Sequence, residues 1–119
     1  ENTKVVLAEP QTANDAYESF INKRVIPVSN PNTIADGLKT SLSEKTFKII
    51  LDGTDQIVTI EEEEIVNSMK LIWERLKIVC EPSCSLPLAA VLKNKKKFKG
   101  KKIGLILTGG NVDVNNLPF

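Results

Sequence analysis

Apolar residues gather in short runs near both ends of the chain. Residues 5–8 (VVLA) are rich in β-branched side chains and are followed by Glu9 and Pro10, so they predict a buried strand that the proline stops. Residues 56–60 alternate between polar and apolar side chains, as a half-buried strand does. Residues 103–107 (IGLIL) predict a further buried strand, which leads into the loop at 108–111.

Apolar positions at helical spacing lie between these runs. Residues 15–22 and 44–51 predict two helices, and a longer helix begins after residue 60, where Thr59 and Glu62 fit a capping box. The apolar residues of this longer helix recur at steps of three and four, at Ile65, Met69, Ile72, Leu76 and Val79. The glutamates at 61–64 suit the positive end of its dipole. Residues 86–92 predict a last helix that opens near Pro82.

Strands therefore alternate with helices along the chain. This order predicts the α/β class, with a mainly parallel sheet and flanking helices. A chain of 119 residues is long enough for one core and too short for two ordinary domains, so we expect residues 1–119 to form one unit.

Composition and charge narrow the function only slightly. Apolar residues make up 41% and charged residues 26% of the chain, as in soluble globular domains, and no apolar run could span a bilayer. The N-terminus has no signal character, so a cytoplasmic setting is expected. Seven of the ten residues at 93–102 are lysine, which predicts a solvated basic loop or, alternatively, a polyanion-binding patch. Phe98 is the only aromatic residue there, so no nucleic-acid or membrane partner is expected.

Two cysteines, Cys80 and Cys84, stand four residues apart, and the chain has no histidine. A tetrahedral zinc site needs four such ligands, so both residues are interpreted as ordinary thiols.

Loops at strand ends are the usual ligand sites of α/β sheets. The loop at 9–15 offers the carboxylates of Glu9 and Asp15 and free carbonyls, hard oxygen ligands that suit Mg²⁺ or Ca²⁺; the alternative is a surface acidic pair. In the loop at 33–40, Gly37 allows backbone to approach a flat ligand, or it forms a plain turn.

The other two candidates lie in the second half of the chain. Glu81 precedes Pro82 between two apolar helical segments, where it is either a carboxylate with a perturbed pKa or a residue that begins a helix. Residues 108–111 (TGGN) follow a predicted strand, and their glycines allow a ligand to approach closely or form a tight turn. No G-x-G-x-x-G fingerprint for a dinucleotide is present.

Taken in order, four stretches resemble one family: VVLAEP, TIADGLKTS, LIWERLKIVCEP and ILTGGNVD. They are similar to the fold-type II pyridoxal-phosphate (PLP) enzymes, specifically the serine racemase and serine/threonine dehydratase family. The resemblance implies that residues 1–119 are the C-terminal portion of an incomplete large domain with the tryptophan-synthase-beta-like fold.

The resemblance also implies roles for individual residues. Thr108 would donate a hydrogen bond to the pyridine nitrogen of PLP, with Gly109 beside it and Glu81 close to the ring. Asp36 and Gly37 would line the cofactor cleft, and Thr40 would lie on the substrate side.

A divalent cation, Mg²⁺ or Ca²⁺, is implied at Glu9, the carbonyl of Ala13 and Asp15. By the same resemblance, Lys77 and Asn111 match positions that hold an allosteric ATP across the interface of a homodimer.

The implied reaction is α-proton abstraction from L-serine, D-serine or L-threonine, with racemisation or β-elimination. The family's catalytic lysine lies ahead of the matched segments, so the chain alone is expected to be inactive. The alternative is a truncated relative without catalysis, acting as a binding or regulatory module. Leu86 and Pro87 favour this alternative, since the family has small residues there, beside the cofactor.

Overall fold

The structure, a computed structural model, describes residues 3–119, and its strands alternate with helices. The elements in chain order are β1 (Val6–Pro10), the 3-10 turn η1 (Gln11–Ala13), α1 (Asp15–Asn22), the 3-10 turn η2 (Asp36–Leu38), α2 (Glu44–Gly53), β2 (Gln56–Ile60), α3 (Glu62–Leu71), the π-helical turn η3 (Ile72–Leu76), α4 (Pro82–Lys93) and α5 (Lys95–Phe98).

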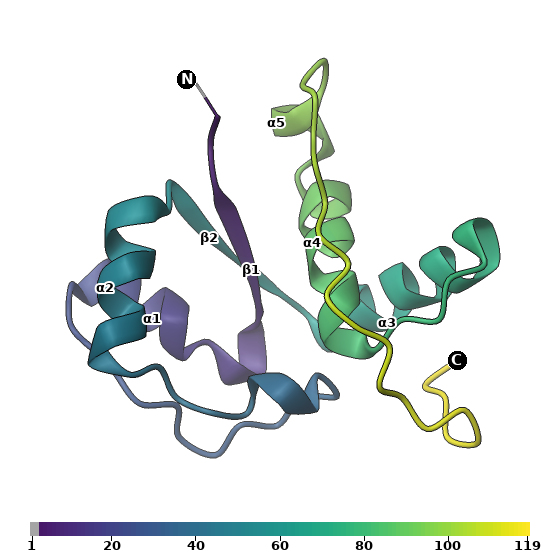
Figure 1. Ribbon diagram of the computed structural model, residues 1–119, viewed down its shortest axis with the longest axis horizontal. Coiled ribbons are helices and arrows are strands. Elements are labelled where there is room, and N and C mark those ends of the chain that lie inside the picture. Colours follow the sequence, from purple (N-terminus) through teal and green to yellow (C-terminus); the bar gives the residue numbers. More distant parts are fainter. Residues whose placement is uncertain (1–2) are drawn as a thin grey trace.

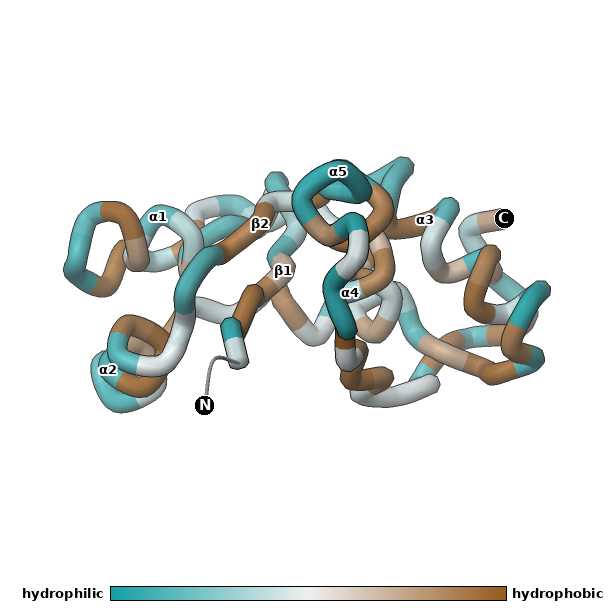
Figure 2. Tube along the Cα trace, turned by 90° about the horizontal axis from the view of Figure 1, so that it is seen from above, coloured by the Kyte–Doolittle hydropathy of each residue, from teal (hydrophilic) through white to brown (hydrophobic). Residues whose placement is uncertain are grey.

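The two strands form a parallel sheet between layers of helices. β1 and β2 pair from Val6 opposite Gln56 to Pro10 opposite Ile60. α1 and α2, which connect the strands, lie on one side of the sheet, and α4 packs on the other side with α3 beyond it (Figures 1 and 2). The predicted α/β class with a parallel sheet is confirmed. No helix of residues 3–119 is long and apolar enough to cross a membrane.

The core lies where α3 and α4 pack against β2. Leu86 of α4 is only 2% exposed and packs with Ile60 and Ile65. A second buried cluster joins the end of α3 to the start of α4 through Met69, Ile72, Cys80 and Cys84. Leu86 therefore fills the core between helix and sheet, so its bulk, which favoured a relative without catalysis, is buried.

The first strand ends at the proline as predicted, but its bounds are later than the expected 5–8. Glu9 and Pro10 both belong to β1, because a proline at the end of a strand leaves no central ladder bond unmade. The capping box is also displaced. β2 continues through Ile60, so Thr59 stays in the ladder, and Glu61 and Glu64 form the reciprocal pair.

The long apolar stripe is shorter than its periodicity predicted. Met69 and Ile72 are buried, but Leu76 and Val79 are 57% and 54% exposed. The helix widens into the π-helical turn η3, which rotates the following side chains off the buried face, and it ends at Lys77 in the left-handed conformation.

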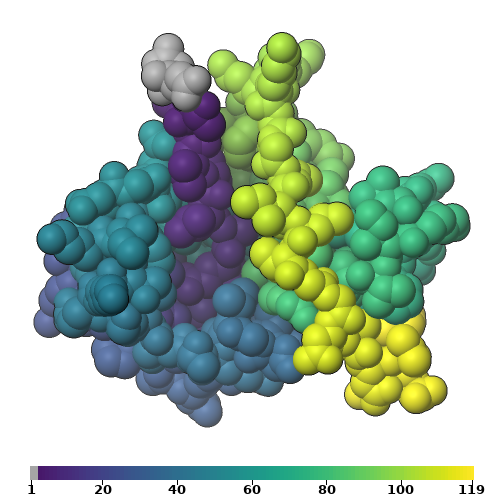
Figure 3. Space-filling model, viewed as in Figure 1, coloured from purple at the N-terminus to yellow at the C-terminus, as the bar shows by residue number. Residues whose placement is uncertain are grey.

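Residues 103–107 do not form the predicted strand, because no described strand lies beside them to complete a ladder. They run as an extended segment along α4 and continue across the surface, where the space-filling view shows the chain from about residue 101 onward in yellow (Figures 1 and 3). Ile106 is 76% exposed. The predicted basic loop at 93–102 is partly helical, since it contains the end of α4 and all of α5.

Candidate functional site

The first part of the site is a clamp between the start of α4 and the loop at 108–111. The backbone N–H of Glu81 donates to the carbonyl of Gly109 at 3.1 Å, and the N–H of Asn111 donates to Oε2 of Glu81, also at 3.1 Å. The hydroxyl of Ser83 donates to Oε1 of Glu81 at 2.8 Å. The Glu81 carboxylate thus fixes the loop to the helix, and Thr108 at its start stays exposed.

The two glycines of this loop are required by their close neighbours. A Cβ on Gly110 would lie 2.6 Å from the carbonyl oxygen of Val79, which is backbone and cannot swing away. A Cβ on Gly109 would lie 3.3 Å from Oε1 of Glu81, at the end of a flexible side chain. The Gly-Gly pair is therefore explained by close packing of the loop against residues 79–81.

The turn η2 forms the second part of the site. It packs against α4 and lies near the end of α4 that follows Glu81 (Figure 1). Leu38 contacts the core, whereas Asp36, Gly37 and Thr40 are exposed. A Cβ on Gly37 would meet no atom within 4 Å, so packing within the described residues does not require this glycine.

The third part is a pair of buried carboxylates. Glu9 is 8% and Asp15 4% exposed. Glu9 accepts hydrogen bonds from the N–H groups of Ala16 at 3.1 Å and Tyr17 at 2.9 Å, and Asp15 accepts one from Leu42 at 2.8 Å. Burial raises the pKa of Glu9 to about 7, against the two hydrogen bonds that lower it, and the neighbouring Asp15 raises it further.

A pair of buried carboxylates without a cationic partner fits a divalent cation, and Ala13, whose carbonyl would be the third ligand, is also buried. No cluster of three His, Cys, Asp or Glu side chains that could hold a metal occurs in residues 3–119. The predicted site needs only two such side chains.

Comparison with known proteins decides the family. The family model described as pyridoxal-phosphate dependent enzyme matches residues 1–109. The chain belongs to the PLP-dependent enzymes. It is 47% identical over 117 residues to the beta-hydroxyaspartate dehydratase of Paracoccus denitrificans (strain Pd 1222), covering 98% of this chain and 37% of that protein. It is 45% identical over 120 residues to the serine racemase of Dictyostelium discoideum, with the same coverage of both chains.

The fold comparison agrees. The structure of maize serine racemase superimposes with a TM-score of 0.88 at 36% identity, covering 94% of this chain and 36% of that one. The predicted resemblance to fold-type II PLP enzymes is thus confirmed. The chain spans 37% of the length of the first two relatives.

In this PLP-family chain the residues around Glu81 are compatible with the cofactor. The clamp holds the loop at 108–111 while Thr108 is exposed, and the turn η2, with Asp36 and Gly37 exposed, packs on the same α4. The positions of Lys77 and Asn111 are less informative about a nucleotide. Lys77 is the exposed left-handed residue after η3, and the backbone of Asn111 is already bonded to Glu81.

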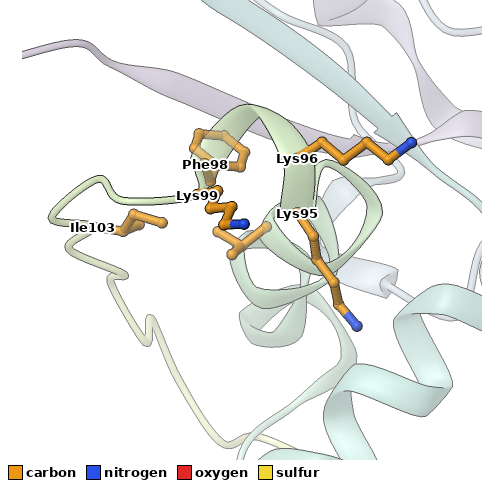
Figure 4. A pocket seen from close by; sticks show the side chains of 6 residues that line it. Lys95, Lys96, Phe98, Lys99 and Ile103 are labelled. Carbon is orange, nitrogen blue, oxygen red and sulfur yellow. The ribbon is translucent and has the colours of Figure 1, made fainter.

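The basic run forms a separate, open pocket at the other end of α4. Its walls are Val91, Phe98, Ile103 and the stems of three lysines. Figure 4 shows the ammonium groups of Lys95 and Lys96 pointing away from Phe98. Because these charges do not converge on the pocket, it has no arrangement that would hold one anion.

Sequence reasoning missed the loop contacts of Glu62. The run of four glutamates at 61–64 predicts partners of the helix dipole, and Glu62 is also expected in a capping box with Thr59. In the structure Glu62 accepts hydrogen bonds from two loops, one at Thr12 and one at Ile34. Neither expectation indicates a contact with a loop distant in sequence.

Proposed function

We propose that the complete protein is a PLP-dependent enzyme that removes the α-proton of a small β-hydroxy amino acid, with racemisation or with β-elimination to a keto acid and ammonia. The observation that supports this proposal most directly is the Glu81 clamp, which holds the loop beginning at Thr108 against the start of α4. Among the relatives are a beta-hydroxyaspartate dehydratase and serine racemases. The amino acids in these names, beta-hydroxyaspartate and serine, both carry a β-hydroxyl group.

Thr108 would hold the cofactor through its exposed hydroxyl, donating a hydrogen bond to the ring nitrogen. A neutral hydroxyl, unlike a carboxylate, does not keep that nitrogen protonated. PLP supplies the electron sink for loss of the α-proton. A lone hydroxyl partner makes that sink weaker, so proton removal depends more on other groups in the complete protein.

Glu81 would act as a positioning residue and not as a base. Both of its carboxylate oxygens already accept hydrogen bonds, one from Ser83 and the other from Asn111. Asp36 and Gly37 would border the cofactor, and Thr40 would face the substrate, since all three are exposed on the segment that carries η2.

The buried pair Glu9 and Asp15, with the carbonyl of Ala13, would hold Mg²⁺ or Ca²⁺. The cation would stabilise the loop after β1 by offsetting the cost of burying two carboxylates. A homodimer and an ATP effector site at Lys77 and Asn111 remain parts of the proposal that follow from the family resemblance, as does the inactivity of residues 1–119 by themselves. A cytoplasmic location also remains a proposal, and it rests on the sequence and not on the family.

The second candidate function is that of a relative without catalysis. It was favoured by the bulk of Leu86 and Pro87, and the structure weakens that support. Leu86 packs in the core, and Pro87 lies within α4, where the helix continues through it. Leu86 is therefore not placed to obstruct the loop at 108–111, and Pro87 does not break the helix.

The test compares Thr108→Ala with Thr108→Ser in the complete protein. We expect the alanine variant to lose bound PLP, followed by its absorbance after dialysis, and to lose at least about tenfold in rate, as a hydrogen bond of about 1.4 kcal/mol predicts. The serine variant keeps the hydroxyl and should retain both. Formation of D-serine and of keto acid from L-serine, L-threonine and 3-hydroxyaspartate separates the two reactions. Equal PLP retention and rates in both variants would rule out the role of Thr108.

A further inference from the structure

The segment at 33–42 contains Asp36, Gly37 and Thr40 but has little regular structure of its own. Its only regular element is the turn η2. Two carboxylates from other parts of the chain hold its ends. The N–H of Ile34 donates to Oε2 of Glu62 at 2.9 Å, and the N–H of Leu42 donates to Oδ2 of Asp15 at 2.8 Å. The segment is thus held near both ends by carboxylates, while Leu38 in its middle packs against the core and Asp36, Gly37 and Thr40 stay exposed.

Glu62 also reaches the loop after β1. The hydroxyl of Thr12 donates to Oε1 of Glu62 at 2.8 Å, so each carboxylate oxygen serves a different loop. The carbonyl of Thr12 in turn accepts a bond from the N–H of Asn32 at 3.3 Å. Thr12 lies in η1, next to Ala13. One side chain at the start of α3 therefore ties η1 to the segment at 33–42.

We propose that Glu62 is a positioning residue that holds the segment at 33–42 in register with η1. The proposal rests on the proposed function for the roles of Asp36, Gly37 and Thr40. Asp15 holds the other end of the segment through Leu42. The loop after β1, proposed to bind the cation, is therefore joined to the segment at 33–42, proposed to border cofactor and substrate, at two points: through Asp15 and through Glu62. A change in one loop is passed to the other through these two carboxylates.

The ordinary function of a glutamate at a helix start does not account for these contacts. Favourable interaction with the helix dipole needs only a negative charge in the first turn, and Glu63 supplies one from an exposed position. The capping box is made by Glu61 and Glu64. Glu62 is the member of this run whose two oxygens reach η1 and residue 34.

Glu63 therefore provides the matched control. Glu63→Ala removes the same charge from the same helical turn without touching either loop. Glu62→Ala removes both hydrogen bonds. Glu62→Gln can keep both, because its amide oxygen accepts from Ile34 and its amide nitrogen can donate to the hydroxyl of Thr12.

Amide hydrogen exchange of the complete protein, without added cofactor or cation, is the first measurement. We expect the amides at 34–38 to exchange about tenfold faster in Glu62→Ala, the factor for one lost hydrogen bond, and at the unchanged rate in Glu63→Ala and Glu62→Gln. Faster exchange that is confined to α3, or equal exchange in all variants, would overturn the proposal.

Kinetics of the holoenzyme are the second measurement. Glu62→Ala should raise the KM for substrate about tenfold while its melting temperature falls only a few degrees below that of Glu63→Ala, and Glu62→Gln should restore both. An unchanged KM with faster exchange at 34–38 would support the positioning of the segment and count against the role of Thr40 in the proposed function. An enzyme inactive on all three substrates would refute the proposed function, and hydrogen exchange would still decide the role of Glu62.

Discussion

Replacing Gly110 by alanine tests the close packing of the loop at 108–111 directly. The new methyl carbon would lie 2.6 Å from the carbonyl oxygen of Val79 and 3.3 Å from its carbonyl carbon. Real Cβ atoms essentially never approach so closely, so one of the two backbones must move. The backbone near Val79 is anchored, because the next residue, Cys80, is buried and its carbonyl accepts a 2.9 Å hydrogen bond from the indole of Trp73. We therefore expect the loop at 108–111 to move away from Val79, and the backbone at Val79 to stay in place.

The cost can be worked from the contacts that the movement would break. Overpacking a well-packed site costs about 1–3 kcal/mol. Displacement of the loop would also lengthen the 3.1 Å bond from Asn111 to Glu81, which is exposed and contributes no more than about 1 kcal/mol. Gly110→Ala should therefore destabilise the complete protein by about 2–4 kcal/mol and reduce its affinity for PLP.

Two other glycines supply the comparison series. Gly109→Ala meets only the Glu81 carboxylate, at 3.3 Å, and should cost less than about 1 kcal/mol, since a flexible side chain can shift. Gly53→Ala, at the exposed end of α2, meets no atom within 4 Å and should not lower stability. Denaturant unfolding and PLP absorbance are measured for all three variants. If Gly110→Ala were as stable as Gly53→Ala, the close approach to Val79 would be wrong.

Two further predictions concern buried ionisable groups. Asp15→Ala should abolish the rise in melting temperature on adding Mg²⁺ or Ca²⁺. Scanning calorimetry of the wild type and the variant, with and without the cation, measures this rise. A variant still stabilised by the cation would rule out the metal site. Burial raises the pKa of Cys80 to about 11, with a smaller contribution from the adjacent Cys84. In the native protein, Cys80 should therefore react with a thiol reagent at pH 8 at least ~100-fold more slowly than an exposed cysteine. After unfolding it should react completely. Rapid labelling of the native protein would contradict its burial.

The local periodicity of the chain predicted most of its elements. α1 and β2 have the predicted bounds, and α2 is two residues longer. Each of these elements buries one face against its neighbours, so the pattern of apolar positions records its packing even where the neighbour is distant in sequence. The end of α3 escaped prediction because the π-helical turn changes the spacing, and a periodicity argument assumes that the spacing stays constant.

The order of four motifs predicts a cofactor site, but it does not predict the hydrogen bonds of these residues. The family resemblance implies roles for Glu81 and Thr108 at one cofactor without saying what holds them. The bonds that Asn111 donates to Glu81 and Ile34 donates to Glu62 join residues about thirty positions apart, and such pairings depend on how the loops pack after folding. Sequence reasoning therefore found the groups proposed to touch the ligand and missed Glu62, whose contacts are only with other loops.

Residues 103–107 show why an apolar run predicts burial better than it predicts a strand. Apolar side chains on both faces are typical of a central strand in a parallel sheet, which needs a neighbour on each edge for its backbone and helices over both faces. In the described residues the segment is extended beside α4, while Ile103 is 44% and Ile106 76% exposed. An uncovered apolar surface of this kind is costly in water. Because the chain spans 37% of its first two relatives, we expect the rest of a complete large domain to cover this segment and to pair with its backbone.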